Sequence, residues 1–191
     1  MPTGQALHDA RTVLLEAGRR VLAGDGAGAL NSRAVTAASG VAKGVLYRHF
    51  ADFDDYLGVL VAEEARRIGS IEPLVTDSAS AALTDVLEQV FTPTMLGLAS
   101  LLISREGLRR RLRRDGSPEV PLFADATSAV ADVLGAEREV GWIREDADIP
   151  ALALILVGGA HLMYVTAGRA RPTREALDRL VQSILTTRTV G

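Results

Sequence analysis

The sequence predicts an all-α protein with a small N-terminal helical domain, residues 1–57, followed by a larger helical domain, residues 58–191. Three observations lead to this prediction. Apolar residues recur at steps of three and four along residues 5–23, which is the period of an amphipathic helix. Residues 31–50 have the pattern of two short helices joined by a glycine turn. The apolar stretches within residues 150–185 are long enough for helices that form a core.

Length and charge bound the class of protein. With 191 residues the chain is long enough for one large helical core, or for a small domain and a larger one. The 24 acidic residues outnumber the 21 basic ones, so the chain as a whole is not a basic coat for nucleic acid. It has no cysteine, which excludes disulfides and thiolate metal sites. The N-terminal sequence lacks a basic region followed by an apolar run, so we expect no signal peptide and a cytoplasmic protein.

The first predicted helix runs from about Gln5 to Ala23. One face is apolar and the opposite face carries charged side chains. Residues 25–28 end it, because aspartate and glycine favour a turn. We expect this helix to brace the hairpin that follows. The apolar face consists of Leu7, Ala10, Leu14, Ala17 and Val21.

The hairpin at residues 31–50 has the signals of two helix ends. Asn31 is a suitable cap, because its side chain accepts a hydrogen bond from a free backbone N–H of the first helix. Gly40 tolerates a positive φ, so the chain is expected to turn there and to begin a second helix near Ala42. Five apolar residues are spaced to meet inside this unit: Leu30, Val35, Val41, Leu46 and Phe50.

The charge pattern of the hairpin indicates that it binds DNA. No Asp or Glu occurs from Gly26 to Ala51, and the second helix begins with small residues that fit a major groove about 12 Å wide. Tyr47 adds a phenol that can reach a phosphate oxygen. The alternative is a helical hairpin of no special function, because short motifs match by chance. The candidate DNA-contacting residues are Arg33, Thr36, Ala42, Lys43, Gly44, Tyr47, Arg48 and His49.

These residues resemble the DNA-binding domain of the TetR family of bacterial transcriptional repressors. The pieces that fall in register are Leu30, Asn31, Arg33, Val35, Gly40, Val41, Gly44, Leu46, Tyr47, His49 and Phe50. Ser39 and Thr36 stand where the family usually has alanine, which is a mild change, and two further departures concern DNA affinity. Ala42 replaces a serine or threonine and removes a side-chain cap worth about 0.5–2 kcal/mol. Phe53 replaces a lysine that binds phosphate in the family.

The resemblance implies a three-helix helix-turn-helix DNA-binding domain and a C-terminal helical domain for ligand binding and dimerisation. The partners that it implies are double-stranded DNA, a second copy of the chain and a small-molecule effector. We therefore expect a transcriptional regulator, in the role of a repressor, that binds a near-palindromic operator as a homodimer and is released by its effector. The alternative keeps the fold but weakens the DNA binding, which leaves a dimeric ligand-binding or protein-interaction module.

The chain after the hairpin is read as a series of helices. Asp52 can cap a helix that runs to about Gly69, and Asp54 and Asp55 suit its positive N-terminal end. Residues 95–103 are apolar on most sides, and we expect them to pass through the middle of the C-terminal domain. The arginines within residues 109–114 are interpreted as a solvated helix end, with a second nucleic-acid patch or an anionic-lipid contact as alternatives.

The strongest apolar run is residues 150–165. It is shorter than the roughly 20 residues of a membrane span and contains Gly158, Gly159 and His161, so we predict a buried helix and no membrane partner. By the resemblance, this helix and the last one pair with their copies in a second subunit. The expected dimer interface comprises Leu156, Gly159, Met163, Leu177, Leu180, Val181 and Ile184.

The expected effector pocket is chosen from large, soft or polar residues within aliphatic helices, although ordinary core packing explains each of them as well. Its residues are Phe91, Met95, Leu98, Phe123, Trp142, His161 and Tyr164, and Trp142 is expected to be packed. An enzyme is the competing class. Because the three histidines lie far apart and no cysteine nucleophile is present, we predict no catalytic site, metal or cofactor.

Overall fold

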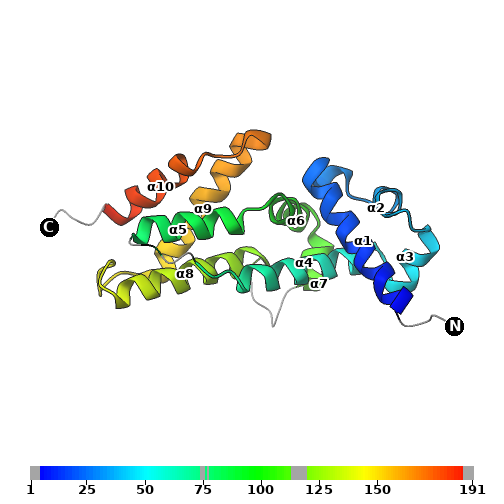
Figure 1. The fold of residues 1–191 in the computed structure, drawn as a ribbon, viewed down its shortest axis with the longest axis horizontal. Coiled ribbons are helices and arrows are strands. Elements are labelled where there is room, and N and C mark those ends of the chain that lie inside the picture. Colours follow the sequence, from blue (N-terminus) through cyan, green and yellow to red (C-terminus); the bar gives the residue numbers. More distant parts are fainter. Residues whose placement is uncertain (1–4, 74–75, 77, 113–119, 187–191) are drawn as a thin grey trace. The chain divides into compact units, whose positions relative to one another are not determined.

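The computed structural model describes residues 5–73, 76, 78–112 and 120–186. Within these ranges every regular element is a helix, which confirms the all-α prediction (Figure 1). The chain divides into two compact units, of which the first joins residues 1–64 with 93–121 and the second joins residues 65–92 with 122–191. The domain boundary at residue 57 stays a prediction, because compactness alone does not assign a function to either part.

The first unit is built around α1 (Gln5–Gly24), which contacts α2, α3 and α6. Its core is formed by Leu14, Val35, Leu46 and Phe50, all at most 2% exposed. The hairpin residues that were predicted to meet inside are therefore buried, except that Val41 is half-buried. The other elements of this unit are η1 (Ala27–Ala29), α2 (Ser32–Ser39), α3 (Lys43–His49), most of α4 (Phe53–Gly69), α6 (Pro93–Ser104) and α7 (Glu106–Leu112).

A fully buried tyrosine joins α4 to α1. The Tyr56 hydroxyl donates a 2.8 Å hydrogen bond to the Leu14 carbonyl oxygen, and burial raises the pKa of Tyr56 above its usual range. Phe50 meets the Tyr56 ring edge-on with the centroids 5.1 Å apart, and Phe53 stacks on it at 5.3 Å. Gly18 lies against this hydroxyl, since a Cβ at that position would stand 2.0 Å from the oxygen. Glycine is thus the residue that lets α1 approach Tyr56.

The position of α6 corrects the sequence prediction. Residues 95–103 were expected to cross the C-terminal domain, but α6 belongs to the first unit and packs on α1 and η1. Gly97 makes this contact close, because a Cβ there would lie 2.8 Å from a methyl carbon of Leu22. A helix that is apolar on most sides has no polar face to show which neighbour it joins, and this explains the error.

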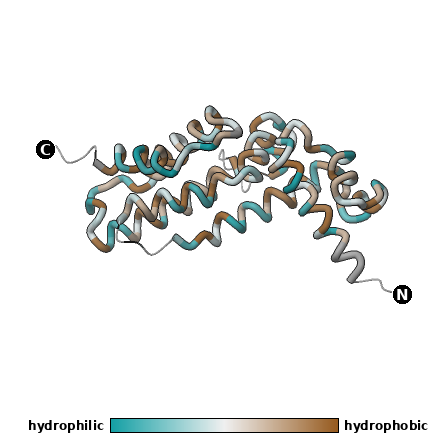
Figure 2. The backbone as a smooth tube through the Cα atoms, turned by 45° about the horizontal axis from the view of Figure 1, so that its top comes forward, coloured by the Kyte–Doolittle hydropathy of each residue, from teal (hydrophilic) through white to brown (hydrophobic). Residues whose placement is uncertain are grey.

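The second unit is a ring of four helices in which each contacts two others. α8 contacts α9, α9 contacts α10, α10 contacts α5, and α5 closes the ring on α8. Figure 2 shows apolar residues in brown and polar residues in teal interleaved along most of the backbone. The elements of this unit are α5 (Ala79–Val90), α8 (Phe123–Glu139), α9 (Ile149–Ala167), η2 (Gly168–Ala170) and α10 (Arg174–Thr186), with the last residues of α4.

Polar contacts fix the ends and the pairing of these helices. Asp148 caps α9 by accepting a 3.1 Å hydrogen bond from the Ala151 amide, and Pro150 occupies the first turn. Ser78 caps α5 in the same way through the Ala81 amide. Between α5 and α10, Ser80 bonds to Asp178 and Arg174 pairs with Glu88. The ring is therefore joined by side chains 86 to 98 residues apart in sequence.

Only one face of α9 is buried, which corrects the prediction of a buried helix in part. Its length of 19 residues and its composition would suffice to cross a membrane, but a core helix passes the same test. The buried side is Ala153, Leu156, Val157, Ala160 and Tyr164. The other side exposes Leu154, Ile155, Leu162 and Val165 by 53–64%. Trp142, which was expected to be packed, is 62% exposed.

Candidate nucleic-acid interface

The helix-turn-helix has the local geometry that its sequence predicts. The Asn31 side chain accepts a 3.0 Å hydrogen bond from the Ala34 amide and caps α2. Gly40 ends α2 with φ at 69°, a left-handed conformation that costs glycine little. Arg20 of α1 donates a 3.0 Å hydrogen bond to the carbonyl oxygen of Ala38, which fixes the end of α2 to the bracing helix. As expected, Ala42 provides no side-chain hydrogen bond at the start of α3.

The residues predicted to contact DNA are mostly at the surface. Leu46 anchors α3 in the core with no exposed area, so the opposite side of the helix faces outward. Tyr47 is 42% exposed, and the Lys43 ammonium lies 5.9 Å from the centre of its ring. This cation–π contact holds a positive charge beside a phenol on one face. Six of the eight candidates are exposed, namely Arg33, Ala42, Lys43, Gly44, Tyr47 and Arg48.

The other two candidates, Thr36 and His49, are half-buried. The Thr36 hydroxyl donates to the carbonyl oxygens of Ser32 and Arg33 at 2.9 and 3.1 Å, so its proton is used within α2. The His49 Nε2 is buried without a protein partner within the described part of the chain. Their contacts with DNA stay predictions, and the geometry favours the six exposed residues over these two.

The start of α4 lies immediately after α3 and is acidic. Asp52 accepts a 2.6 Å hydrogen bond from the Asp55 amide, and Asp55 accepts one of 2.9 Å from the Ala51 amide. These two carboxylates cap the helix reciprocally. Phe53 is half-buried and stacks on Tyr56, which gives a physical reason for an aromatic residue at this position.

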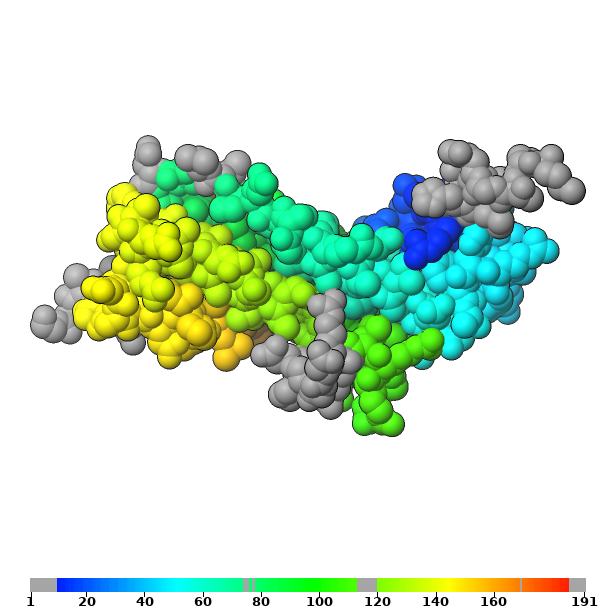
Figure 3. Space-filling view, turned by 90° about the horizontal axis from the view of Figure 1, so that it is seen from below, coloured from blue at the N-terminus to red at the C-terminus, as the bar shows by residue number. Residues whose placement is uncertain are grey.

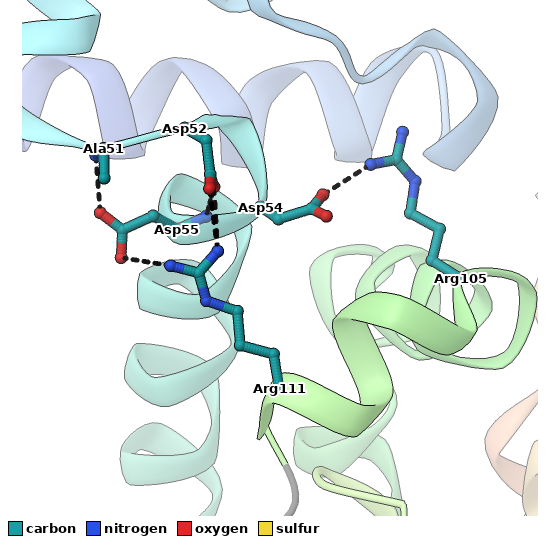
Figure 4. A network of polar contacts seen from close by, with 6 residues as sticks. All are labelled: Ala51, Asp52, Asp54, Asp55, Arg105 and Arg111. Carbon is teal, nitrogen blue, oxygen red and sulfur yellow. Dashed lines mark hydrogen bonds and ion pairs between the residues drawn. The ribbon is translucent and has the colours of Figure 1, made fainter.

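Sequence reasoning missed two residues at this place. Arg105 and Arg111 pair with the carboxylates at the start of α4, as Figure 4 shows. The Asp52 carboxylate is 59 residues away from Arg111 in the sequence, so no local pattern connects them. The arginine run that contains Arg111 was interpreted as a solvated helix end. Its last members, Arg113 and Arg114, lie outside the described residues.

The predicted effector-pocket residues do not form one group. Phe91, Phe123, His161 and Tyr164 cluster in the second unit, with the Phe91 and Tyr164 rings 5.2 Å apart and the Phe123 and His161 rings 4.8 Å apart. Met95 and Leu98 are buried in the first unit instead. Trp142 lines a separate cavity of about 280 Å³ with Ile184 and Leu185.

Another cavity of the second unit contains none of the predicted residues. It has a volume of about 350 Å³ and lies between the end of α4 and α8. Ile68, Ile71 and Val133 form apolar parts of its wall, while Asp125 and Asp132 are acidic parts. No pattern in the sequence indicated this cavity, because its walls come from two segments that are far apart along the chain.

The residues predicted for the dimer interface differ in their exposure within the chain. Leu156, Leu177 and Val181 have no exposed area, and a Cβ at Gly159 would stand 3.1 Å from a methyl carbon of Leu180. Met163, Leu180 and Ile184 are half-buried. The three buried side chains hold α9 and α10 to their own neighbours, and the choice of dimer residues stays a prediction. The prediction that α9 and α10 form an interface is separate and stays open.

Comparison with known proteins places these features in context. Residues 14–54 match the family model described as bacterial regulatory proteins, tetR family. This model covers the helix-turn-helix and the start of α4. No curated protein matches the chain at a significant level. Among the described residues, no group of three or more His, Cys, Asp or Glu is arranged to hold a metal ion.

Solved structures share the fold over nearly the whole chain. The fatty acid degradation regulator FadR from Bacillus halodurans has a TM-score of 0.69 and 15% identity, covering 94% of this chain and 96% of that one. A transcriptional regulator from Rhodococcus sp. Rha1 has a TM-score of 0.62 and 19% identity, and the match covers 92% of this chain and 95% of that one. The TetR family transcriptional regulator PfmR from Thermus thermophilus has a TM-score of 0.59 and 17% identity, and the match covers 90% of this chain and 96% of that one. At these identities the likeness concerns the fold, and the family resemblance seen in residues 31–50 is confirmed by the family model.

Proposed function

We propose that this chain, which carries the helix-turn-helix of the bacterial tetR family and the fold of its regulators, is a cytoplasmic DNA-binding repressor of transcription. The observation that carries the proposal is the exposed face of α3. There Lys43, Tyr47 and Arg48 stand together, while Leu46 fixes the helix to the core. A short helix presented in this way fits a major groove, and its cations and phenol suit phosphate oxygens.

Binding to DNA that flanks the protein's own gene tests this proposal. The wild-type protein is expected to bind one segment with nanomolar affinity, and to bind it more weakly as salt rises because phosphate contacts release counterions. Lys43→Ala should lower the salt slope by about one and weaken binding to all sequences. Tyr47→Ala should weaken binding further than Tyr47→Phe, because the phenylalanine keeps the ring beside Lys43.

Arg138→Ala is the control for this experiment, since it removes an exposed charge from α8 in the second unit. It should leave the affinity unchanged. If the wild-type protein bound flanking DNA no tighter than random DNA, a selection of bound genomic fragments would decide between two cases. Either the operator lies elsewhere in the genome, or the helix-turn-helix no longer binds DNA specifically. An equal loss in Lys43→Ala and Arg138→Ala would contradict the assignment of α3.

The active form in this proposal is a homodimer on a near-palindromic operator. One α3 contacts few base pairs, whereas a two-fold dimer presents two copies to successive major grooves about 34–36 Å apart. The surface that supports the dimer is the exposed apolar face of α9, with Leu154, Ile155, Leu162 and Val165 along the helix. Exposed apolar stripes of this kind mark protein interfaces. We take a second copy as the partner because one isologous contact would cover the stripe on both copies and relate the two α3 helices by a two-fold axis.

The effector in this proposal is a small, largely apolar molecule that binds the second unit and releases DNA. The cluster of Phe91, Phe123, His161 and Tyr164 supports this choice of site, because the Nδ1 of His161 is buried without a protein partner among the described residues. Burial also lowers the pKa of His161, so the imidazole is neutral at pH 7 and suits a neutral ligand. A ligand releases DNA only if it binds one conformation better than the other.

A thermal-shift screen of apolar metabolites tests the effector. A compound that binds the folded state at 100 times its dissociation constant should add about 2.7 kcal/mol to the free energy of unfolding and raise the melting temperature. The shift should shrink in His161→Leu, which keeps the volume but removes the ring nitrogens. Compounds that shift the melting temperature equally in wild type and His161→Leu would place the effector elsewhere, with the 350 Å³ cavity beside α8 as the next site to test.

A further inference from the structure

The acidic start of α4 stands close to the proposed DNA contact. Asp52 follows Arg48 of α3 by four residues, and four residues of extended chain span at most about 14 Å. The Debye length is about 8 Å in cellular salt and about 30 Å at 0.01 M salt, so a carboxylate at that distance is partly screened in the cell and acts fully on phosphates bound at α3 in low salt. Asp54 and Asp55 follow Asp52 by two and three residues, in the first turn of α4. Three negative charges therefore adjoin the surface that must attract DNA.

The charge of the helix-turn-helix segment shows why this matters. Between residues 31 and 55 the basic side chains are Arg33, Lys43 and Arg48, and the acidic ones are the three aspartates. Their formal charges cancel. DNA affinity rests chiefly on neutralising phosphates with positive side chains, so a segment of zero net charge lacks the usual attraction. The missing positive charge has to come from another part of the fold.

Two arginines from a distant segment supply it. The Arg105 guanidinium, in the link between α6 and α7, lies 2.9 Å from an Asp54 oxygen. The Arg111 guanidinium of α7 lies 3.0 and 3.1 Å from the two Asp52 oxygens and 3.9 Å from Asp55 (Figure 4). All of these residues belong to the first unit, and Figure 3 shows the green surface of α7 beside the cyan surface of the α3–α4 segment.

The carboxylates of these pairs are charged at neutral pH and lie at the surface, as charge compensation requires. The Asp55 amide and the Arg111 guanidinium hold the pKa of Asp52 below its usual range, so the carboxylate remains charged at neutral pH. The pairs are open to solvent, with side chains 37–57% exposed. Exposed pairs contribute little to folding stability. Their effect is therefore expected in the field above the surface and not in the stability of the fold.

We propose that Arg105 and Arg111 are determinants of DNA affinity, which act by neutralising the carboxylates at the start of α4. Together they change the formal charge of the helix-turn-helix segment and its partners from zero to plus two. The inference rests on the proposed function, since it requires α3 to bind duplex DNA. Neither arginine has to touch DNA, because each acts through an aspartate. The arginine run of α7 thus has a role beyond that of a solvated helix end.

The test compares two neighbouring arginines in one helix. Arg111→Gln removes the partner of Asp52, whereas Arg110→Gln removes an equal charge one residue away that pairs with Glu106 inside α7. Duplex DNA binding is measured for both across salt, with the melting temperature as a check on folding. In low salt Arg111→Gln should weaken binding about fivefold and Arg110→Gln less than about twofold, because only the first exposes a carboxylate beside α3, and the difference should shrink as salt rises.

A charge rescue separates this role from a structural one. Asp52→Asn keeps the oxygen that caps α4 and removes the charge, so adding it to Arg111→Gln should restore wild-type affinity although the pair is gone. A loss that Asp52→Asn fails to restore would show that Arg111 only positions α4 and would overturn the inference. Equal losses in the two arginine variants would overturn it as well.

Lys43→Ala distinguishes a failure of this inference from a failure of the proposed function. If Lys43→Ala weakens DNA binding while Arg111→Gln does not, the helix-turn-helix binds DNA and the compensation by Arg111 is wrong. If the wild-type protein binds no duplex in low salt, the proposed function fails and the inference falls with it.

Discussion

Ile155→Glu is expected to convert the protein into a monomer that has lost tight operator binding. Ile155 is 53% exposed on the free face of α9, so a glutamate is solvated there in one subunit and costs the isolated fold little. In the proposed dimer the same position is covered, and burying an unpaired carboxylate in each copy costs several kcal/mol. Operator affinity should fall by about 100-fold or more, because the second half-site then no longer binds as part of one molecule.

Sedimentation analysis and DNA binding measure this prediction together. Ile103 provides a matched control, since it is also an isoleucine that is 53% exposed but lies on α6 in the first unit. Ile103→Glu should remain dimeric and should keep its operator affinity within a few-fold of wild type. A wild-type protein that sediments as a monomer at every concentration would contradict the dimer. Dimers that persist in both Ile155→Glu and Leu162→Glu would place the interface on another face.

The helix-turn-helix was predictable because its signals are local. The cap at Asn31 and the turn at Gly40 each depend on residues within about four positions, and the structure has both. The apolar residues of the hairpin follow the helical period, so their burial also followed from the sequence. Local rules of this kind work for short motifs that carry their own start and stop signals.

The corrections have a common physical cause. α6 and α9 are apolar on most sides, so their sequences do not tell a side that faces the core from a side that faces solvent or a partner. In α9, for example, Leu156 is buried and its neighbour Ile155 is exposed, although both are large apolar residues. Periodicity identifies a helix but cannot orient one whose polar face is missing.

Long-range pairs were the other part that the sequence did not contain. Arg111 is 59 residues from Asp52 and Arg105 is 51 residues from Asp54. The run of arginines and the run of aspartates were each noticed, but only the fold brings them together. In the sequence the arginines and the aspartates are two separate clusters. Each has a local explanation of its own, because cations favour the end of a helix and anions favour its start.

The Gly18→Ala variant is expected to lose stability at the contact between α1 and α4. The new Cβ would stand 2.0 Å from the Tyr56 hydroxyl oxygen, far inside van der Waals contact. Tyr56 has no room to move, because Phe50 and Phe53 lie against its ring and its hydroxyl bonds to Leu14. Overpacking of a core typically costs about 1–3 kcal/mol, and this clash falls at the upper end. For a chain of this length, about 3 kcal/mol corresponds to a fall of about 6–12 °C in melting temperature.

A double-mutant cycle identifies the hydroxyl as the cause of that loss. Tyr56→Phe alone should cost about 1 kcal/mol for the hydrogen bond to Leu14, but in the Gly18→Ala background it should raise stability, because the nearest remaining ring carbon is 3.1 Å from the new Cβ. Gly24→Ala in the same helix is the control, since a Cβ there meets nothing within 4 Å. Circular dichroism during urea and thermal unfolding measures the wild type and each of these variants. Additive losses in the double variant would mean that α1 shifts away from α4 as a whole, and that Gly18 sets the distance between these helices through the backbone instead of through the Tyr56 hydroxyl.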